Sequence, residues 1–493
     1  MQETIWALVP AIVAIALALA TKEVYVSLLV GIISGALFFT NFHVFDALET
    51  TFAIMSDKVG SNTNILIFLV LLGMLVSLMS KSGASRAYGK WAAGSIHSKR
   101  GALFSTAALG ALIFVDDYFN CLTVGTVMSP VTDRFHISRA KLAYIIDATA
   151  APVCIIAPIS SWAAAVGSSL PEGSDIDGFG LFLRTIPFNL YALLTIGMII
   201  FMIAMQFDFG AMRKYQEKPP VKEESAEDIL KKGKVYDLVI PIVTLILFCV
   251  AAMLYTGGIT EGESIVSAFA NCNSSLSLVF GSFFTIIVIA LLYLPRRIMR
   301  FSEFANSLVD GFKAMVPAIL ILTFAWTLSG VCGEGYLNAG GYVSRVVNGS
   351  QMAQGILPAA FFLIAMGLSF ATGTSWGTFG ILIPIAAAIF GGQDSQLLVI
   401  TVAAVLAGAV CGDHISPISD TTILASTGAG CNHIEHVATQ LPYAMLVAVC
   451  SFVGYLLAGF TQNGWLALGT GALLMFGMLL VLYRKSKKIS VQE

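Results

Sequence analysis

The chain has 493 residues, of which 57% are hydrophobic and only 11% are charged, and its formal net charge is −2. Soluble proteins carry about 25% charged residues, so this composition indicates an all-α protein that crosses a membrane many times. The near-neutral charge and the lack of a basic domain argue against a nucleic-acid partner. The eight cysteines form no Cys-x-x-Cys pair, so we expect neither a disulfide framework nor a zinc site.

Apolar runs long enough to cross a lipid bilayer recur along the whole chain. A spanning helix needs roughly 17–25 residues. The N-terminus has no positive charge and no small-residue cleavage site, so we expect its first run to be a retained span. About 11 transmembrane helices are predicted in this way. In chain order they are 5–20, 24–39, 65–79, 141–166, 186–205, 238–254, 276–294, 316–331, 397–427, 442–460 and 465–483.

Four apolar stretches are interrupted by polar residues, Gly or Pro. Pro and Gly break helices, and non-helical backbone at membrane depth survives only where protein or water surrounds it. We therefore predict two re-entrant hairpins and two broken helices around a midplane site, an arrangement typical of secondary transporters. The hairpins are 101–130, interrupted at 116–120, and 355–390, interrupted at 372–378; the broken helices are 141–166, interrupted at 157–161, and 397–427, interrupted at 412–420.

The order of these elements repeats. Pro158-Ile159-Ser160 and Pro417-Ile418-Ser419 stand at an offset of 259, and Leu48, Phe52 and Met55 match Leu308, Phe312 and Met315 at an offset of 260. We predict a first repeat over 1–206, a cytoplasmic linker over 207–237, a second repeat over 238–460, and an extra C-terminal helix and tail over 461–493.

Basic residues predict the orientation, because Lys and Arg mark cytoplasmic loops. Placing the N-terminus outside and the C-terminus in the cytoplasm leaves only Lys58, Arg184 and Arg345 of the 27 basic residues outside. Under this orientation the two repeats are inverted. The basic clusters are 81–100, 134–141, 213–234, 296–300 and 484–488, and the loops 167–177 and 257–275 contain acids but no Lys or Arg.

Aspartates and other oxygen donors gather at the four interruptions. An ionised carboxylate at bilayer depth costs several kcal/mol, roughly 2.5–3.5 on insertion scales, so such residues usually face a hydrated cation path. Oxygen ligands suit a hard cation such as Na⁺, and we predict Na⁺ at Asp116, Asp117, Asp413 and Asp420, with H⁺ as the second ion. The predicted cation- or proton-binding residues are Asp116, Asp117, Asn120, Thr123, Asp147, Thr149, Ser160, Asp413, Ser416, Ser419, Asp420 and Thr421. Thr372, Thr374, Ser375, Trp376, Thr378 and His414 are predicted to line a substrate cavity.

Simpler interpretations exist for each residue taken alone. A single hydroxyl more often bonds within its own helix, and a single aspartate can cap a helix. Asp116 and Asp117 are adjacent, and neighbours do not face one way on a helix, so we expect them to have different roles.

The histidines and Trp376 leave alternatives open. His414 is either a proton-sensing group or a neutral histidine bonded to a freed carbonyl. His433, Glu435 and His436 follow the second broken helix, and we expect a cytoplasmic surface or pH-sensing role rather than a metal site. Trp376 either walls a substrate cavity or packs.

The motifs at the interruptions also resemble those of a known family. Residues 412–430 and 431–443, Asp116 to Asn120 with 122–125, and 137–153 are similar to the signatures of the NhaC-type sodium/proton antiporter family, in the ion-transporter superfamily. The resemblance covers nearly the whole chain. It implies a scaffold domain and a moving, elevator-like transport domain, and commonly a homodimer. Relatives of this type include sodium/proton exchangers, a malate–lactate exchanger and sodium-coupled amino-acid carriers, so the resemblance leaves the cargo open.

These observations predict an integral protein of the bacterial inner (plasma) membrane that is not an enzyme, since it contains no His-Glu-x-x-His motif. The leading function is a sodium-coupled secondary active transporter, in its simplest form a Na⁺/H⁺ antiporter that works by alternating access. The alternative is a Na⁺-coupled symporter or exchanger of a small organic solute, either an amino acid or a small carboxylate. A third possibility is an ion channel, because re-entrant hairpins also occur in pores.

Overall fold

The computed structural model describes residues 2–21, 23–84, 87, 91, 94–170, 177–215, 233–265, 268, 272–333, 335–339, 342, 351–390 and 394–489. Across these residues the ordered elements are all helices, which confirms the predicted all-α class. Arg345 and parts of the predicted linker 207–237, of the loops 81–100, 167–177 and 257–275, and of the C-terminal tail lie outside the described residues.

The helices of the first half follow the predicted apolar runs closely. Many begin at a Ser, Asn or Asp whose side chain accepts a backbone N–H, as Ser98 and Ser138 do. The elements are η1 (Ile5–Leu8), α1 (Val9–Thr21), α2 (Val24–Phe39), α3 (Val44–Ser61), α4 (Thr63–Lys81), α6 (Lys99–Leu112), α7 (Asp117–Arg134), α8 (Arg139–Thr149), α9 (Ala151–Cys154), α10 (Ser161–Ser168), α11 (Gly178–Thr185), η2 (Ile186–Phe188), α12 (Leu190–Met205) and α13 (Ala211–Tyr215).

The second half has fewer and longer helices. Its amphipathic segment and the following span form one helix, α17, whereas the corresponding part of the first half is divided into α3 and α4 at Asn62. The elements are α14 (Tyr236–Thr256), η4 (Ile259–Glu261), α16 (Ser274–Tyr293), α17 (Phe301–Cys332), α19 (Gln351–Thr372), α20 (Ser375–Ile389), α21 (Gln396–Ile415), α22 (Asp420–Ala429), α23 (His433–Thr461) and α24 (Gly464–Ile489).

Eight of the described helices are long and apolar enough to cross a membrane, or up to ten if each of two bent helix pairs counts as one span. The bent pairs are α2 with α3, at 120°, and 178–188 with α12, at 46°. The predicted broken helix 141–166 falls outside this count because α8 has only 11 residues and α10 only 8. The chain is therefore a polytopic membrane protein, and the total of about 11 spans stays a prediction.

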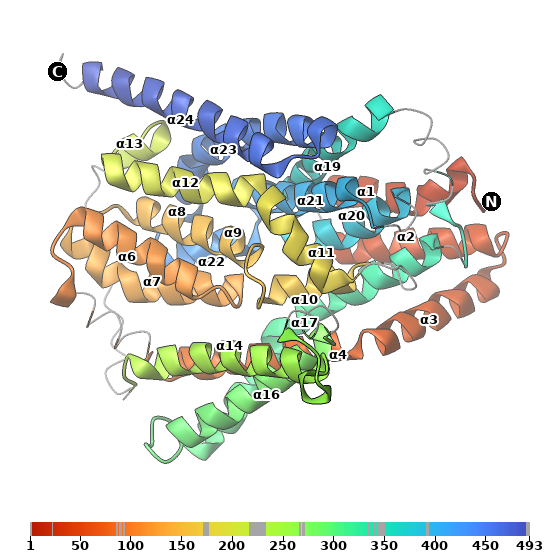
Figure 1. The fold of residues 1–493 in the computed structure, drawn as a ribbon, viewed down its shortest axis with the longest axis horizontal. Coiled ribbons are helices and arrows are strands. Elements are labelled where there is room, and N and C mark those ends of the chain that lie inside the picture. The colour runs from red at the N-terminus through yellow and green to blue at the C-terminus, as the bar shows by residue number, and fades with distance from the viewer. Residues whose placement is uncertain are drawn as a thin grey trace.

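The helices pack in two groups (Figure 1). One group contains α2, α3, α4, α14, α16 and α17, and the other contains α6 to α8, α12 and α19 to α24. α10 packs against both α4 and α20, so it lies at the boundary between the groups. In Figure 1, α8, α9 and α21 lie between the layer of α23 and α24 and the layer of α14 and α16.

Two helices are almost entirely buried. All residues of α21 from Leu398 to Ile415 are buried, as are those of α8 from Ala140 to Thr149. Asp147 lies near the end of α8, and Asp413 and His414 lie near the end of α21. The fold therefore brings these ionisable side chains into the interior, where an uncompensated charge is costly.

Candidate functional site

Each of the four predicted interruptions is closed by the same kind of helix cap. Asp116 precedes α7, Ser160 precedes α10, Thr374 precedes α20 and Ser419 precedes α22. Their side-chain oxygens accept the backbone N–H three residues on, at 2.9, 3.2, 3.3 and 3.1 Å respectively. An N-cap satisfies one of the free N–H groups of a helix start. The unwound segments are thus ordered turns with defined ends.

A backbone hydrogen bond ties each hairpin to its neighbouring broken helix. The N–H of Ser161 donates to the carbonyl of Val115 at 2.9 Å, and the N–H of Asp420 donates to the carbonyl of Gly373 at 3.3 Å. In both cases the donor follows the cap of the broken helix and the acceptor precedes the cap of the hairpin. The same local arrangement therefore occurs once in each half of the chain.

Asp116 and Asp117 are both buried but face different partners. Asp116 is the cap of α7, whereas the Oδ2 atom of Asp117 accepts the Nε1–H of Trp162 at 3.1 Å. The Oδ1 atom of Asp117 accepts no hydrogen bond from the described residues. A buried oxygen without a donor, near other carboxylates, is a suitable ligand for a cation.

Asn120 fixes the shape of the first interruption. Its Nδ2 group lies 2.6 Å from the carbonyl oxygen of Gly110, 2.9 Å from that of Ile113 and 3.2 Å from that of Thr149. It therefore connects the turn of the hairpin to the end of α8. The Oδ1 atom of Asn120 is buried and has no donor among the described residues, so it remains available to a cation.

A chain of hydroxyls leads to Asp413 at the second interruption. Thr421 donates to the Oδ2 atom of Asp413 at 2.6 Å, and Ser419 lies 3.2 Å from the Thr421 hydroxyl. The Oδ1 atom of Asp413 has no donor in the described part of the chain. The hydroxyl of Thr422 lies between two groups, 3.1 Å from the Oδ2 atom of Asp147 and 3.2 Å from the carbonyl of Asp413.

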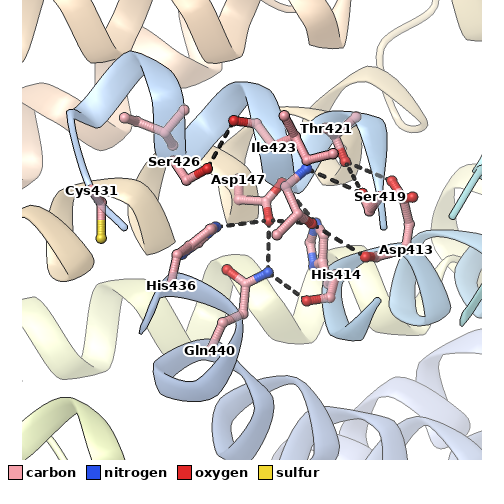
Figure 2. Close-up of polar contacts among 12 residues, drawn as sticks. Asp147, Asp413, His414, Ser419, Thr421, Ile423, Ser426, Cys431, His436 and Gln440 are labelled. Carbon is pink, nitrogen blue, oxygen red and sulfur yellow. Dashed lines mark hydrogen bonds and ion pairs between the residues drawn. The ribbon is translucent and has the colours of Figure 1, made fainter. Parts of the chain in front are cut away.

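Asp147 lies at the centre of a buried polar cluster built from four helices (Figure 2). Its Oδ2 atom accepts from Gln440 Nε2 at 2.7 Å and lies 3.3 Å from His436 Nε2, in addition to its bond with Thr422. His414 Nε2 lies 3.9 Å from the Oδ1 atom of Asp147, and His414 Nδ1 lies 3.0 Å from the hydroxyl of Tyr191. The only ion-pair partners of Asp147 among the described residues are thus the two histidines.

The sequence analysis did not assign two members of this cluster, His436 and Gln440, to the ion-binding site. His436 was expected at a cytoplasmic surface or in a pH-sensing role, but its side chain is fully buried, so the surface interpretation is wrong. Gln440 was not singled out at all. The signal was the spacing of four residues between them, which places both side chains on one face of the polar first turns of α23.

Two of the predicted cavity residues of the second hairpin use their hydroxyls in hydrogen bonds to nearby backbone carbonyls. Thr372 donates to the carbonyl of Leu368 at 2.8 Å and Thr378 donates to that of Thr374 at 2.9 Å. Trp376 packs against the rings of Trp162 and Phe379. The start of α10 in the first half and the start of α20 in the second half are therefore in aromatic contact.

Ser375 has the Gly-x-Ser-x-Gly spacing of some nucleophilic serines. Its hydroxyl instead donates to the carbonyl of Ala409 at 3.2 Å, and it has no histidine partner among the described residues. This serine therefore links α20 to α21.

The remaining predicted residues lie at the edges of the site. Asp420 is exposed at the start of α22. Ser416 donates to the carbonyl of Phe370 at 2.8 Å, and Thr149 donates to that of Ile145 at 2.7 Å. Thr123 is buried on α7. Among the described residues, no three His, Cys, Asp or Glu side chains converge as they would around a transition-metal ion.

Comparison with known proteins gives the class of protein that this fold and site define. Residues 163–460 match the model of the Na⁺/H⁺ antiporter family, and the chain belongs to that family. The chain is 42% identical to an uncharacterised protein of Haemophilus influenzae, over 94% of this chain and 92% of that protein. It is 32% identical to a malate-2H⁺/Na⁺-lactate antiporter of Bacillus subtilis, over 33% of this chain and 34% of the relative.

The fold is also similar to that of a solved transporter. The crystal structure of the Alcanivorax borkumensis YdaH transporter aligns with a TM-score of 0.57 at 12% identity, over 88% of this chain and 90% of that one. At this identity the likeness concerns the fold alone. Family and fold together identify an integral membrane transporter, which agrees with the predicted NhaC-type family and with a protein that is not an enzyme.

Proposed function

We propose that this protein is a sodium-coupled secondary active transporter and that its leading activity is Na⁺/H⁺ antiport by alternating access. The observation that carries the proposal is that two buried carboxylates at the helix interruptions, Asp117 and Asp413, each keep an oxygen atom that accepts no hydrogen bond from the described residues. Burying an unpaired carboxylate costs several kcal/mol, and a cation or a proton removes that cost.

We assign sodium to the carboxylates at the two places where a hairpin interruption meets the interruption of the neighbouring broken helix. Asp117 and Asp413 offer free oxygens, Asn120 offers an amide oxygen, and Asp116 keeps the α7 cap in place beside them. Asp420, which is exposed on the next turn, is assigned to the entry of the cation. This division gives Asp116 and Asp117 different roles, because one caps a helix and the other faces Trp162.

The proton is assigned to Asp147 and its histidines. Asp147 has three hydrogen-bond partners at its Oδ2 atom and two histidines nearby, so a proton that enters this cluster has several places to reside. Thr422 contacts both Asp147 and the backbone of Asp413. The proposed proton-binding cluster and the proposed sodium ligands are therefore separated by one side chain. This closeness supports competition between the two ions.

The proposed architecture is a pair of inverted repeats, 1–206 and 238–460, joined by the linker 207–237. The capped and tied interruptions that occur once in each half support it. The group of α2, α3, α4, α14, α16 and α17 serves as scaffold, and the group that holds the interruptions moves. We place the protein as a homodimer in the bacterial inner membrane, with the N-terminus outside and the C-terminus in the cytoplasm.

A second candidate is Na⁺-coupled exchange or symport of an amino acid or small carboxylate. The observation that favours it is the similarity to a relative named as a malate-2H⁺/Na⁺-lactate antiporter, whose name combines sodium, protons and organic acids. The two candidates differ in whether an organic solute must be present for sodium to move protons.

The test is proton flux in proteoliposomes that contain the purified full-length protein and an internal pH dye. An imposed Na⁺ gradient should move protons without any organic solute, and Asp117→Asn and Asp413→Asn should each abolish the flux. Asp46→Asn, which changes an exposed carboxylate on α3, is the matched control and should transport normally. Strict dependence on an added solute would support the second candidate, and single-channel currents in a planar bilayer would contradict both.

A further inference from the structure

A polar cavity lies where the two helix groups meet, away from the buried carboxylates. Its volume is about 180 Å³. Its walls come from the α3–α4 junction and α16 on one side and from α10 and the start of α11 on the other. Figure 1 shows α10 close to α4 in this region. The lining residues are Ser61, Asn62, Asn64, Ile65, Ala163, Ala164, Gly167, Asp177, Gly178, Phe179, Ser275 and Leu278.

Among the described residues, the lining combines amides with one carboxylate and contains no basic side chain. The side chain of Asn64 forms no hydrogen bond with the described residues, and that of Asn62 uses only its Nδ2 group, which donates to the carbonyl of Lys58 at 3.0 Å. Each oxygen of Asp177 accepts one backbone N–H of α11, at 3.2 and 2.7 Å. A carboxylate has about four acceptor positions, so Asp177 can still accept an ammonium group.

The size and chemistry of the cavity restrict its occupant. The volume is below the roughly 300–1,000 Å³ of pockets that hold drug-sized ligands. Without Lys or Arg in the lining, a dianion has no counter-charge. An ammonium group facing Asp177, with polar oxygens facing the amides of Asn62 and Asn64, matches these three side chains. A small zwitterionic amino acid has this composition.

The cavity and the carboxylate site share one helix. Ala163 and Ala164 line the cavity, and the preceding residue, Trp162, donates to Asp117. Ser161 ties the start of the same helix to the first hairpin. A ligand in the cavity therefore touches the helix whose first turn contacts the proposed sodium group.

We propose that this cavity is a binding site for a small zwitterionic amino acid, formed jointly by the two helix groups and coupled through α10 to the cation site. The coupling rests on the proposed function; the binding does not. Because one wall belongs to the first group and the other to α10 and α11, which pack against α20 and α21 of the second group, a displacement of one group against the other would open or close the site.

The test measures binding to the purified full-length protein by isothermal titration calorimetry, with L-serine as the probe and L-malate as the comparison. L-serine should bind and L-malate should not. Asn64→Ala should raise the dissociation constant for L-serine about tenfold, which corresponds to about 1.4 kcal/mol. Asp177→Asn should raise it similarly, because the amide can still cap α11 but loses the charge that attracts the ammonium group. Asn306→Ala, at an exposed asparagine of α17, is the matched control and should leave binding unchanged.

The outcomes separate this inference from the proposed function. Size-exclusion profiles and melting temperatures of the variants show whether they fold, and Asn64→Gln retains the amide if Asn64→Ala does not fold. Equal L-serine affinity in Asn64→Ala and Asn306→Ala, preference for L-malate, or no binding of L-serine at tens of millimolar would each overturn the site. If wild-type protein shows no sodium-driven proton flux but L-serine binding depends on Asn64 and Asp177, the proposed function fails and the binding site stands.

Discussion

Replacement of Asp147 by asparagine should abolish proton-coupled transport without destabilising the protein. The asparagine oxygen can take the place of the Oδ2 atom and accept from Gln440, Thr422 and His436. Hydrogen bonds to a charged acceptor contribute about 1.5–3 kcal/mol and neutral ones about 0.5–1.5, so three bonds lose roughly 3–4 kcal/mol in total. Removing a buried charge offsets this loss by several kcal/mol. The free energy of unfolding should therefore change by no more than about 1–2 kcal/mol.

The alanine variant provides the contrast. Asp147→Ala leaves the Nε2–H of His436 and one N–H of Gln440 buried without an acceptor, since the other N–H of Gln440 still reaches the carbonyl of His414 at 2.8 Å. An unsatisfied buried donor costs about 1–3 kcal/mol, so the loss for two donors is roughly 2–6 kcal/mol.

Thermal unfolding in detergent and sodium-driven proton flux in proteoliposomes check both variants. The asparagine variant should melt within a few degrees of wild type and be inactive, and the alanine variant should melt clearly lower. If the two variants lose equal stability, the hydrogen-bond reasoning is wrong. If the asparagine variant still exchanges protons for sodium, the assignment of the proton to Asp147 is wrong.

Three further predictions concern packing and the sodium group. Lys141→Met removes one partner of the buried Lys141–Asp208 ion pair, whose side-chain exposures are 3% and 8%, and should cost about 3–5 kcal/mol in unfolding free energy. Lys81→Met breaks the exposed Lys81–Asp310 pair and should cost less than about 1 kcal/mol. Equal losses of the two variants in chemical denaturation would contradict this expectation. Gly125→Ala places a Cβ atom 2.3 Å from the backbone of the neighbouring α22 and should cost roughly 1–3 kcal/mol, while Gly60→Ala, with open space around it, should be neutral or stabilising in the same melt. Trp162→Phe removes the indole donor to Asp117, one of the proposed sodium ligands. It should change the sodium concentration for half-maximal flux by several-fold, with the melting temperature near that of wild type. An unchanged sodium dependence would show that this contact does not affect sodium binding.

The helix interruptions were predictable because their cause is local. Pro, Gly and capping side chains at 157–161 and 412–420 disrupt the helix wherever the chain folds. The structure places the actual gaps at 155–160 and 416–419, so the sequence located them within a few residues. Asp116 was among the predicted ligands, but the surrounding sequence does not distinguish a helix-capping role from a cation-binding role.

The partners of Asp147 were harder to predict because they are distant in sequence. Gln440 and His436 stand 293 and 289 residues from Asp147, and their side chains reach it only because α23 packs against α8 and α21. No local pattern specifies which face of α23 turns inward. The same limit applies to Asp420, which shares a motif with Asp413 but is exposed at the start of α22, after the turn.

The bonds from Ser161 to Val115 and from Asp420 to Gly373 have a mechanical consequence. Each hairpin end is fastened to the helix that follows it in the same half, so neither tip can swing open without breaking a buried backbone bond and exposing its groups to a nonpolar environment. If the proposed function holds, we expect an ion bound between these tips to cross the bilayer by displacement of the whole surrounding body, not by bending of a gate. Spin labels on the two tips of one half should keep a constant separation in every state, while their distance to α4 changes.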